Sequence, residues 1–268
     1  MFQVDGRPTA ARVILDLLTA SPQVEFGLDM LTLAGEIMGL SPANMRVSAA
    51  RLCTEGKITR TARGSYTLRT EALPAYTEVS SWRTRIERMV AWEGTWNAVD
   101  HSRVKRSDRA ILRAHHTALS LAGMAHWTPA VALRPNNLDH GTHGLRVTLS
   151  RLGAAAECHV YRIDEMSTGD VEAVPRLWDT AARTRRLQEA SRALTDAART
   201  RDNYTAVENA RTSLLLGSAV ISTIVHDPLL PEELAPVTPL VELIEQMKDF
   251  QDHALTLWLQ LLHDGRRT

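Results

Sequence analysis

Residues 41–52 have the sequence SPANMRVSAARL, and this stretch predicts a helix whose start is marked by its own residues. Ser41 can accept hydrogen bonds from the first free backbone amides of a helix. Pro42 suits the first helical position, because its missing N–H would have no intrahelical partner there. Gly56 is typical of a helix end. We therefore expect a helix that begins directly after Ser41 and ends before Gly56.

The two faces of this helix differ in character. At about 100° per residue, three apolar side chains share one side and predict its buried face, namely Met45, Ala49 and Leu52. The side chains that face away from them are Asn44, Val47 and Arg51, with Arg46 and Ser48 on the flanks. Base edges in a major groove are recognised by such groups: Arg pairs with guanine, Asn with adenine, and an aliphatic group contacts the thymine methyl. The outer face therefore predicts sequence-specific contacts with DNA.

The neighbouring segments predict the domain in which this helix lies. Apolar spacing and β-prone runs predict four further elements, which are helices at about 8–20 and 28–38 and strands at 57–61 and 65–68. Arg63 and Gly64 join the two strands, which indicates a hairpin. Three helices followed by a small hairpin predict a winged helix-turn-helix domain over residues 1–73.

Positive charge gathers on the same segment. The chain has 31 basic and 31 acidic residues, so its zero net charge excludes a globally basic binder. Between Arg46 and Arg69, however, Glu55 is the only acid among six basic residues. Such a local bias attracts phosphates. The predicted DNA-binding residues are Ser41, Asn44, Arg46, Val47, Ser48, Arg51, Lys57, Arg60, Arg63 and Tyr66. The alternative is a protein-interaction module with an ordinary basic surface.

Composition places the chain among globular proteins. Its 268 residues are 44% apolar and 23% charged, which is typical of a globular protein of more than one domain. Cys53 and Cys158 lie far apart, which fits a reducing compartment rather than a disulfide framework. Residues 1–8 lack the apolar core of a signal peptide, and the apolar stretch 214–225 is too short to span a bilayer. We expect a cytoplasmic protein without a membrane partner.

The rest of the chain predicts two further domains, which makes the expected fold α+β and mostly helical. Over residues 82–165 the predicted elements are strands at 95–100, 124–128, 130–133 and 158–163 and helices at 106–121 and 144–152. Their β-α-β-β-α-β order is that of a ferredoxin-like domain. Residues 174–268 predict a helical effector and dimerisation domain, with helices at about 175–201, 206–225 and 237–263.

Several motifs together resemble a known family. Residues 41–52, followed by Gly56, resemble the recognition helix of the PaaX-like repressors, whose N-terminal domain is similar to the GntR winged helix. Four further stretches resemble motifs of that family in the same order, namely Trp92-Glu93-Gly94-Thr95-Trp96, Arg134-Pro135-Asn136-Asn137-Leu138, Leu177-Trp178-Asp179 and the sequence DPLLPEEL at 227–234. Each motif alone is weak, and their common order makes the set more specific.

The resemblance implies a dimeric repressor of aromatic-acid catabolism genes that is released from its operator by an aryl-CoA thioester such as phenylacetyl-CoA. The chain departs from the family pattern in two places. Residues 217–221 are small and apolar where a stretch with His and Arg is expected, and Leu187-Gln188 stands where an aromatic residue is expected. Both departures lie in the half of the chain expected to bind the effector. The resemblance therefore supports DNA binding more strongly than it supports the identity of the effector.

The tryptophans allow two interpretations. Their usual role is packing in a core or an interface. The alternative is that Trp92, Trp96 and Trp178 line a pocket for the aryl acyl group, with Arg134 close to the phosphates of CoA.

Catalysis has little support in the sequence. Asp139-His140 with His143 forms a possible metal cluster, but no Cys at suitable spacing accompanies it. Asp100 ends the first strand of the expected ferredoxin-like domain, where some metal-dependent nucleases carry an acid, but no second acid accompanies it. Neither a G-x-S-x-G elbow nor a phosphate-binding G-x-x-x-x-G-K-[ST] loop is present. We expect a regulator rather than an enzyme, with no metal and no cofactor, and the nuclease is the alternative.

Overall fold

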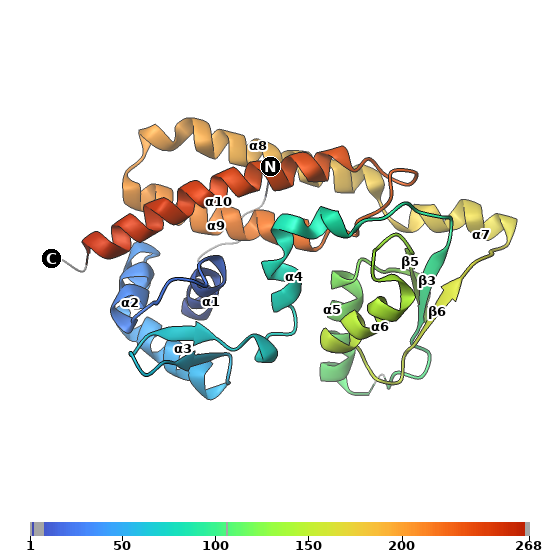
Figure 1. Cartoon of the computed structure of the whole chain (residues 1–268), viewed down its shortest axis with the longest axis horizontal. Coiled ribbons are helices and arrows are strands. Elements are labelled where there is room, and N and C mark those ends of the chain that lie inside the picture. The colour runs from blue at the N-terminus through green and yellow to red at the C-terminus, as the bar shows by residue number, and fades with distance from the viewer. Residues whose placement is uncertain (1, 3–7, 106, 266–268) are drawn as a thin grey trace. The chain divides into compact units, whose positions relative to one another are not determined.

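The computed structural model describes residues 2, 8–105 and 107–265, and the fold is α+β and mostly helical (Figure 1). The chain divides into two compact units. Unit 1 comprises residues 1–80, 189–222 and 244–268, and unit 2 comprises residues 81–188 and 223–243. This division differs from the three domains expected from the sequence, because the segment 174–268 is shared between the two units. In the part of the chain that the structure describes, no helix is long and apolar enough to cross a membrane.

The first half of unit 1 follows the predicted order of three helices and a hairpin. Its elements are α1 (Ala10–Ala20), α2 (Leu28–Ile37), α3 (Pro42–Thr54), β1 (Ile58–Arg60), β2 (Tyr66–Leu68), η1 (Thr70–Ala72) and α4 (Tyr76–Ser80). The predicted start of α3 is confirmed: the Ser41 hydroxyl accepts from the backbone N–H of Asn44, and Pro42 is the first helical residue. Strands β1 and β2 are antiparallel, with Thr59 opposite Thr67.

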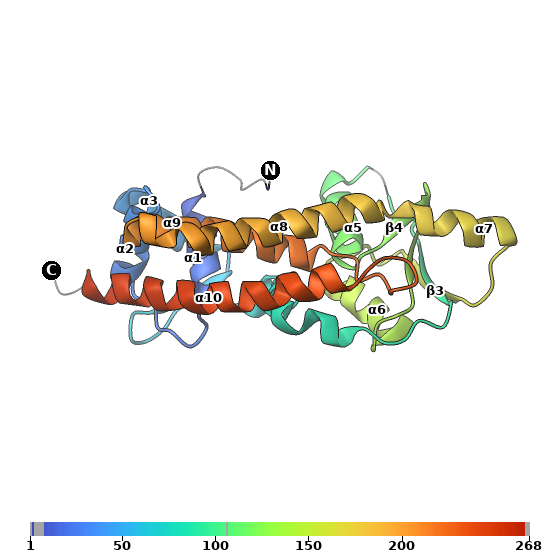
Figure 2. The same cartoon turned by 90° about the horizontal axis from the view of Figure 1, so that it is seen from above.

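The C-terminal part of the chain forms three long helices, α8 (Thr180–Thr200), α9 (Ala206–Val225) and α10 (Thr238–Asp264), with a short turn η4 (Arg201–Asn203) before α9. Helices α8 and α10 run in the same direction and α9 runs against them (Figure 2). Ala210, Trp258 and Leu262 from these helices are buried in one apolar core with residues of α1, α2 and α3. The helical end of the chain therefore helps to hold α3 in place.

Unit 2 is built around a four-stranded antiparallel sheet with strand order β4-β5-β3-β6. The strands are β3 (Trp96–Asp100), β4 (Ala125–Thr128), β5 (Val131–Pro135) and β6 (His159–Ile163). The helical elements are η2 (Trp82–Arg88), α5 (Arg109–Leu121), α6 (Gly141–Arg151), α7 (Thr168–Ala173) and η3 (Val174–Leu177). Strand β3 pairs with both β5 and β6, and four of its five residues are buried, as expected for a central strand.

Three predicted helix starts differ from the observed ones. The helix expected from residue 175 begins at Thr180, because Trp178 is extended and the Asp179 carboxylate accepts from the N–H of Ala182. The helix expected at 106–121 begins at Arg109, where Asp108 caps it, and residue 106 lies outside the described residues. The helix expected at 144–152 begins earlier, at Gly141.

Candidate nucleic-acid interface

Helix α3 buries one face and exposes the other, as its sequence predicts. The side chains of Met45, Ala49 and Leu52 are at most 2% exposed. On the opposite face, Val47 is 69% exposed, and Asn44 and Arg51 are also exposed. An exposed valine flanked by an amide and a guanidinium is a surface that can meet base edges without any change of conformation.

Helix α2 lies very close to α3 at one glycine that the sequence analysis did not single out. A Cβ placed on Gly35 would lie 2.2 Å from Cγ of Met45. Met45 is fully buried, so its side chain would have to shift within the core to make room. The absence of a side chain at Gly35 therefore permits the close packing that presents the outer face of α3.

Three further residues of the predicted set lie on or beside this helix. Arg46 is exposed, and Ser48 is half-buried on the flank. Ser41 is exposed as well, but its hydroxyl oxygen already accepts the N–H of Asn44 at 3.3 Å. Ser41 thus orders the first turn of α3, and any DNA contact from it would use the hydroxyl hydrogen.

Glu55 contacts two of the predicted DNA-binding cations at the end of α3. Lys57 Nζ lies 2.7 Å from Glu55 Oε2, and Arg51 Nε lies 3.6 Å from Glu55 Oε1. The hydrogen bond from Lys57 lowers the pKa of Glu55. Exposed ion pairs of this kind contribute little stability. Both cations can therefore exchange the carboxylate for a phosphate or a base.

At the hairpin tip, Arg63 pairs with a second acid, Glu25, which sequence reasoning missed. Arg63 is 82% exposed, and its Nη1 lies 3.2 Å from Oε1 of Glu25, which precedes α2. Glu25 is also within hydrogen-bond distance of the Ser65 hydroxyl. Arg60 is exposed on β1 and donates to the backbone oxygen of Gly64. Because Glu25 is 38 residues from Arg63 in the chain, no local pattern could have indicated this pair.

Tyr66 is not available to DNA, which corrects its place in the predicted set. Its side chain is only 7% exposed and belongs to the core of unit 1. Its backbone N–H donates to the carbonyl of Phe26 at 2.9 Å. Side chains alternate along β2, so Thr67 is exposed instead. Tyr66 therefore anchors the hairpin.

The three tryptophans expected to line an effector pocket do come together in unit 2. The rings of Trp92 and Trp96 meet edge to face at a centroid distance of 5.1 Å, and those of Trp96 and Trp178 stack at 6.1 Å. Trp96 is buried in an apolar cluster with Leu133 and Val174. Trp96 therefore has the packing role that tryptophans usually have. Trp92 and Trp178 are partly buried and pack against the same cluster.

Arg134 does not face a pocket for phosphates, which corrects the second part of that prediction. Its side chain is 3% exposed. The guanidinium donates to the carbonyl oxygens of Ala122 and Pro135 and to Oδ1 of Asn137. Through these hydrogen bonds, Arg134 links the end of α5 to the segment after β5, and its guanidinium nitrogens are already paired with oxygen atoms of the protein. Arg134 is therefore a structural residue.

The motif at 227–234 is tied to the motif at 134–138. Asn137 Nδ2 donates to the carbonyl oxygen of Leu229 at 2.8 Å. Asp227 accepts from Arg183 through both carboxylate oxygens, at 2.7 and 3.2 Å, and both side chains are buried. Asp227 also accepts the backbone N–H of Leu229, whose φ of 53° is unusual for a residue other than glycine. These two stretches are thus explained by the architecture of unit 2.

Unit 2 also gathers four histidines that the sequence analysis did not connect. The rings of His101, His115, His116 and His126 have neighbouring centroids 5.3 to 6.0 Å apart. His115 is 1% exposed, and burial lowers its pKa to about 4. Across residues 8–105 and 107–265, no group of three or more His, Cys, Asp or Glu side chains could hold a metal ion.

The nuclease alternative rested on Asp100, which ends β3 as predicted. Its Oδ1 accepts the backbone N–H of Ser102 at 2.8 Å, and this hydrogen bond lowers its pKa. Asp100 therefore closes the turn after β3, and the structure gives it a local role that requires no metal.

Comparisons with known proteins show a likeness of fold. No protein-family profile matches the sequence, and no curated protein matches it. Among solved structures, the uncharacterized protein Rv0674 from Mycobacterium tuberculosis is similar over 94% of this chain and 98% of its own, with a TM-score of 0.63 and 22% sequence identity. At that identity the likeness concerns the fold alone.

Proposed function

We propose that this chain is a sequence-specific DNA-binding transcriptional regulator, and that residues 8–73 act as its winged helix-turn-helix. The observation that carries the proposal is the outer face of α3. That face exposes Asn44, Val47 and Arg51 over a buried stripe, so the helix can enter a groove without unpacking.

The roles within the interface follow from the chemistry of each side chain. Arg51 suits a guanine, Asn44 an adenine and Val47 a thymine methyl. Cations around the helix and on the hairpin contact the phosphate backbone, which gives affinity without sequence information. These cations are Arg46, Lys57, Arg60 and Arg63.

The central region is proposed to be a ferredoxin-like domain without catalytic function. Its β-α-β-β-α-β order and the strand order β4-β5-β3-β6 support this proposal. Asp100 serves the turn after β3, so we assign it no catalytic role.

The mode of action is proposed from the resemblance to the PaaX-like repressors. In this proposal a cytoplasmic homodimer places two α3 helices in successive major grooves of an inverted repeat, about 34 Å apart. An aryl-CoA thioester would release it by binding one of two conformations more tightly. Among the described residues of α8, α9 and α10, the exposed large apolar side chains are Val207 and Val241. The dimer contact on these helices would therefore be small or largely polar.

Selection from a random library of duplex DNA tests the proposal and requires no assumption about the operator sequence. The full chain should enrich a common sequence of inverted-repeat form over successive rounds. The Arg199→Ala variant is a matched control, because it removes one exposed guanidinium from α8, away from the interface, and should enrich the same sequence. If the chain enriched no sequence over the starting library, the proposed function would be wrong.

A further inference from the structure

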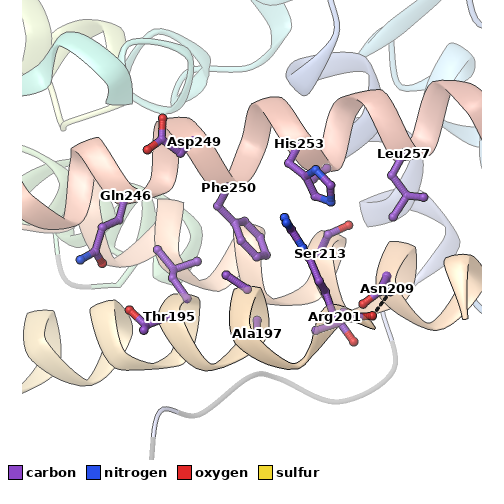
Figure 3. A pocket seen from close by; sticks show the side chains of 14 residues that line it. Thr195, Ala197, Arg201, Asn209, Ser213, Gln246, Asp249, Phe250, His253 and Leu257 are labelled. Carbon is purple, nitrogen blue, oxygen red and sulfur yellow. Dashed lines mark hydrogen bonds between the residues drawn. The ribbon is translucent and has the colours of Figure 1, made fainter. Parts of the chain in front are cut away.

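The three long helices line a cavity that is partly open to solvent and that neither the proposed interface nor the tryptophan cluster uses. It has a volume of about 330 Å³, and all its lining residues belong to unit 1 (Figure 3). Small-molecule sites in proteins begin at about this size. An apolar cavity of about 150 Å³ holds benzene. This cavity therefore has room for one substituted benzene ring, and the nucleotide and pantetheine of a CoA thioester would have to lie outside it.

The middle of the cavity is apolar. The Phe250 ring lies at its centre (Figure 3). Leu194 and Ala197 from α8 and Ala254 and Leu257 from α10 complete the walls. An aromatic ring of a ligand suits this lining, because it can pack against the Phe250 ring and so be buried from water.

One end of the cavity is cationic. The Arg201 side chain extends from the turn η4 toward Phe250 and His253 (Figure 3). Its ion pair with Asp202 is long, at 3.8 Å, and the Asp202 side chain is 94% exposed, so this pair holds the guanidinium weakly. Asn209 donates to the carbonyl oxygens of Arg201 and Tyr204, which fixes the turn. A positioned guanidinium with a weak partner suits a carboxylate, which it can bind through two hydrogen bonds.

The other end of the cavity is polar and carries an acid. Gln246, Thr195 and Asp249 lie there, away from Arg201 (Figure 3). Gln246 Oε1 accepts from the Ser191 hydroxyl at 2.8 Å, which orients the amide. His253 lies seven positions after Gln246 on α10, which corresponds to a rise of about 10 Å along the helix. The Asp249 carboxylate points away from Phe250 (Figure 3), but its negative charge would repel a second acid group on the ligand. Gln246 and Thr195 can hydrogen-bond a ligand hydroxyl at this end.

We propose that this cavity binds a small aromatic monocarboxylic acid. The carboxylate lies at Arg201, the ring packs on Phe250, and a hydrogen or hydroxyl points toward Gln246 and Thr195. This ligand class follows from the volume, the apolar middle and the opposite charges at the two ends. It is distinct from the thioester that the family resemblance implies.

The cavity shares its walls with the core that holds α3. Leu257 lines the cavity and also packs against the core cluster of α1, α2 and α3. Ser213 lines the cavity and accepts from Nε1 of Trp258, which is buried in that cluster. Arg211 on α9 donates to the carbonyl of Ile37 at the end of α2. Provided that the proposed function holds, a bound acid would change DNA affinity through these contacts.

Calorimetric titration of the full chain, without DNA, tests the site. Benzoate and 4-hydroxybenzoate should bind, whereas the neutral benzamide and the dicarboxylate terephthalate should bind at least tenfold more weakly. Arg201→Gln should weaken benzoate at least tenfold, because a charge-assisted pair is lost. Arg199→Gln removes the same charge two residues away, outside the lining, and should leave binding unchanged.

A second variant tests the polarity of the cavity from its other end. Asp249→Asn should bring terephthalate to within threefold of benzoate, because the repelling carboxylate is gone. If neither acid bound at millimolar concentration, or if Arg201→Gln and Arg199→Gln weakened benzoate equally, the site would be refuted.

The two proposals fail in separable ways. A chain that binds benzoate but enriches no duplex retains the cavity site and loses the proposed function. A chain that enriches a duplex but ignores benzoate loses the site alone. If it does both and benzoate leaves the affinity for the selected duplex unchanged within twofold, the coupling through Leu257 and Trp258 is wrong.

Discussion

Arg51 and Arg63 carry the same charge in different surroundings, so their removal should have different effects on DNA binding. Arg51 lies on the outer face of α3, whereas Arg63 lies at the tip of the hairpin. Arg51→Ala should weaken the selected duplex by about 1–3 kcal/mol and relax the preference at one base pair. Arg63→Ala should weaken all duplexes alike and reduce the salt dependence by about one phosphate contact. Fluorescence anisotropy with selected and scrambled duplexes, at several salt concentrations, measures both; equal losses on the two duplexes for Arg51→Ala would contradict its role.

Glu25 competes with phosphate for Arg63, and its replacement should therefore strengthen DNA binding. Glu25→Gln keeps the shape of the side chain and removes the charge that lies 3.2 Å from Arg63 Nη1. Scrambled and selected duplexes should both bind more tightly, while stability changes by no more than about 1 kcal/mol, as for other exposed pairs.

Glu233→Gln is the control for this prediction, because it removes one exposed negative charge from unit 2. It separates the local effect from the change in net charge. If both variants tightened binding to the same degree, the Glu25–Arg63 pair would have no part in it.

At the scale of the elements, Gly35 decides how closely α2 and α3 pack. Gly35→Ala should destabilise unit 1 by about 1–3 kcal/mol, since the new Cβ meets the buried side chain of Met45 and forces it to repack. The same change at Gly169 in α7 meets no atom within 4 Å and should be neutral or stabilising by up to about 1 kcal/mol, as usual for a helical glycine. Urea unfolding followed by circular dichroism gives both values. Similar urea midpoints for the two variants would show that the contact between α2 and α3 can accommodate an extra methyl group.

Helix α3 could be predicted because the information it needs is local. Its cap, its first proline and its apolar stripe all lie within 13 residues, and the structure confirms each of them. The hairpin was also predictable, but the buried face of its second strand was not. In a strand of three residues, the sequence does not tell whether Tyr66 or Thr67 points inward. The position of Tyr66 is set by Phe26, which lies 40 residues away in the chain.

The site residues that the sequence misjudged depend on distant partners. Arg134 was expected close to the phosphates of CoA, beside a tryptophan-lined pocket. It is instead bonded to the carbonyl of Ala122 at the end of α5 and to Asn137. The cavity between α8, α9 and α10 had no signal at all, because Arg201 and Phe250 meet only when three helices pack. Local patterns thus predicted elements, and long-range contacts decided which side chains are free to bind.

At the scale of the whole molecule, a buried ion pair joins two distant segments of unit 2. Arg183 and Asp227 belong to segments that are 44 residues apart, and their side chains are 8% and 2% exposed. Asp227→Asn should destabilise unit 2 by about 3–5 kcal/mol, because it leaves the Arg183 charge buried without its counter-ion. The double variant Arg183→Leu with Asp227→Leu should recover part of this loss.

Calorimetry of the full chain measures these changes. DNA affinity below the unfolding temperature should stay unchanged, since the pair lies in unit 2 and the interface in unit 1. A double variant as unstable as Asp227→Asn would show that the unpaired charge of Arg183 does not cause the loss in the single variant.

The histidine cluster should make unit 2 sensitive to acid. His115 has a pKa of about 4 in the folded chain, lowered by burial, against an ordinary value of 6.5. Between these two values the unfolded chain binds more protons, so stability should be constant above pH 6.5 and fall as the pH drops toward 4, by up to about 3 kcal/mol. His101 and His126 belong to the same cluster, and burial lowers the pKa of each, which adds to the loss of stability.

Urea midpoints measured at about pH 7 and about pH 5 should differ clearly in the natural chain and less in His115→Gln. The glutamine does not titrate, and its amide oxygen can accept the N–H of Ala155 in place of the ring nitrogen. If the two chains lost the same stability on acidification, the proton would be taken up elsewhere, and the buried imidazole would not be the acid-sensitive group of this unit.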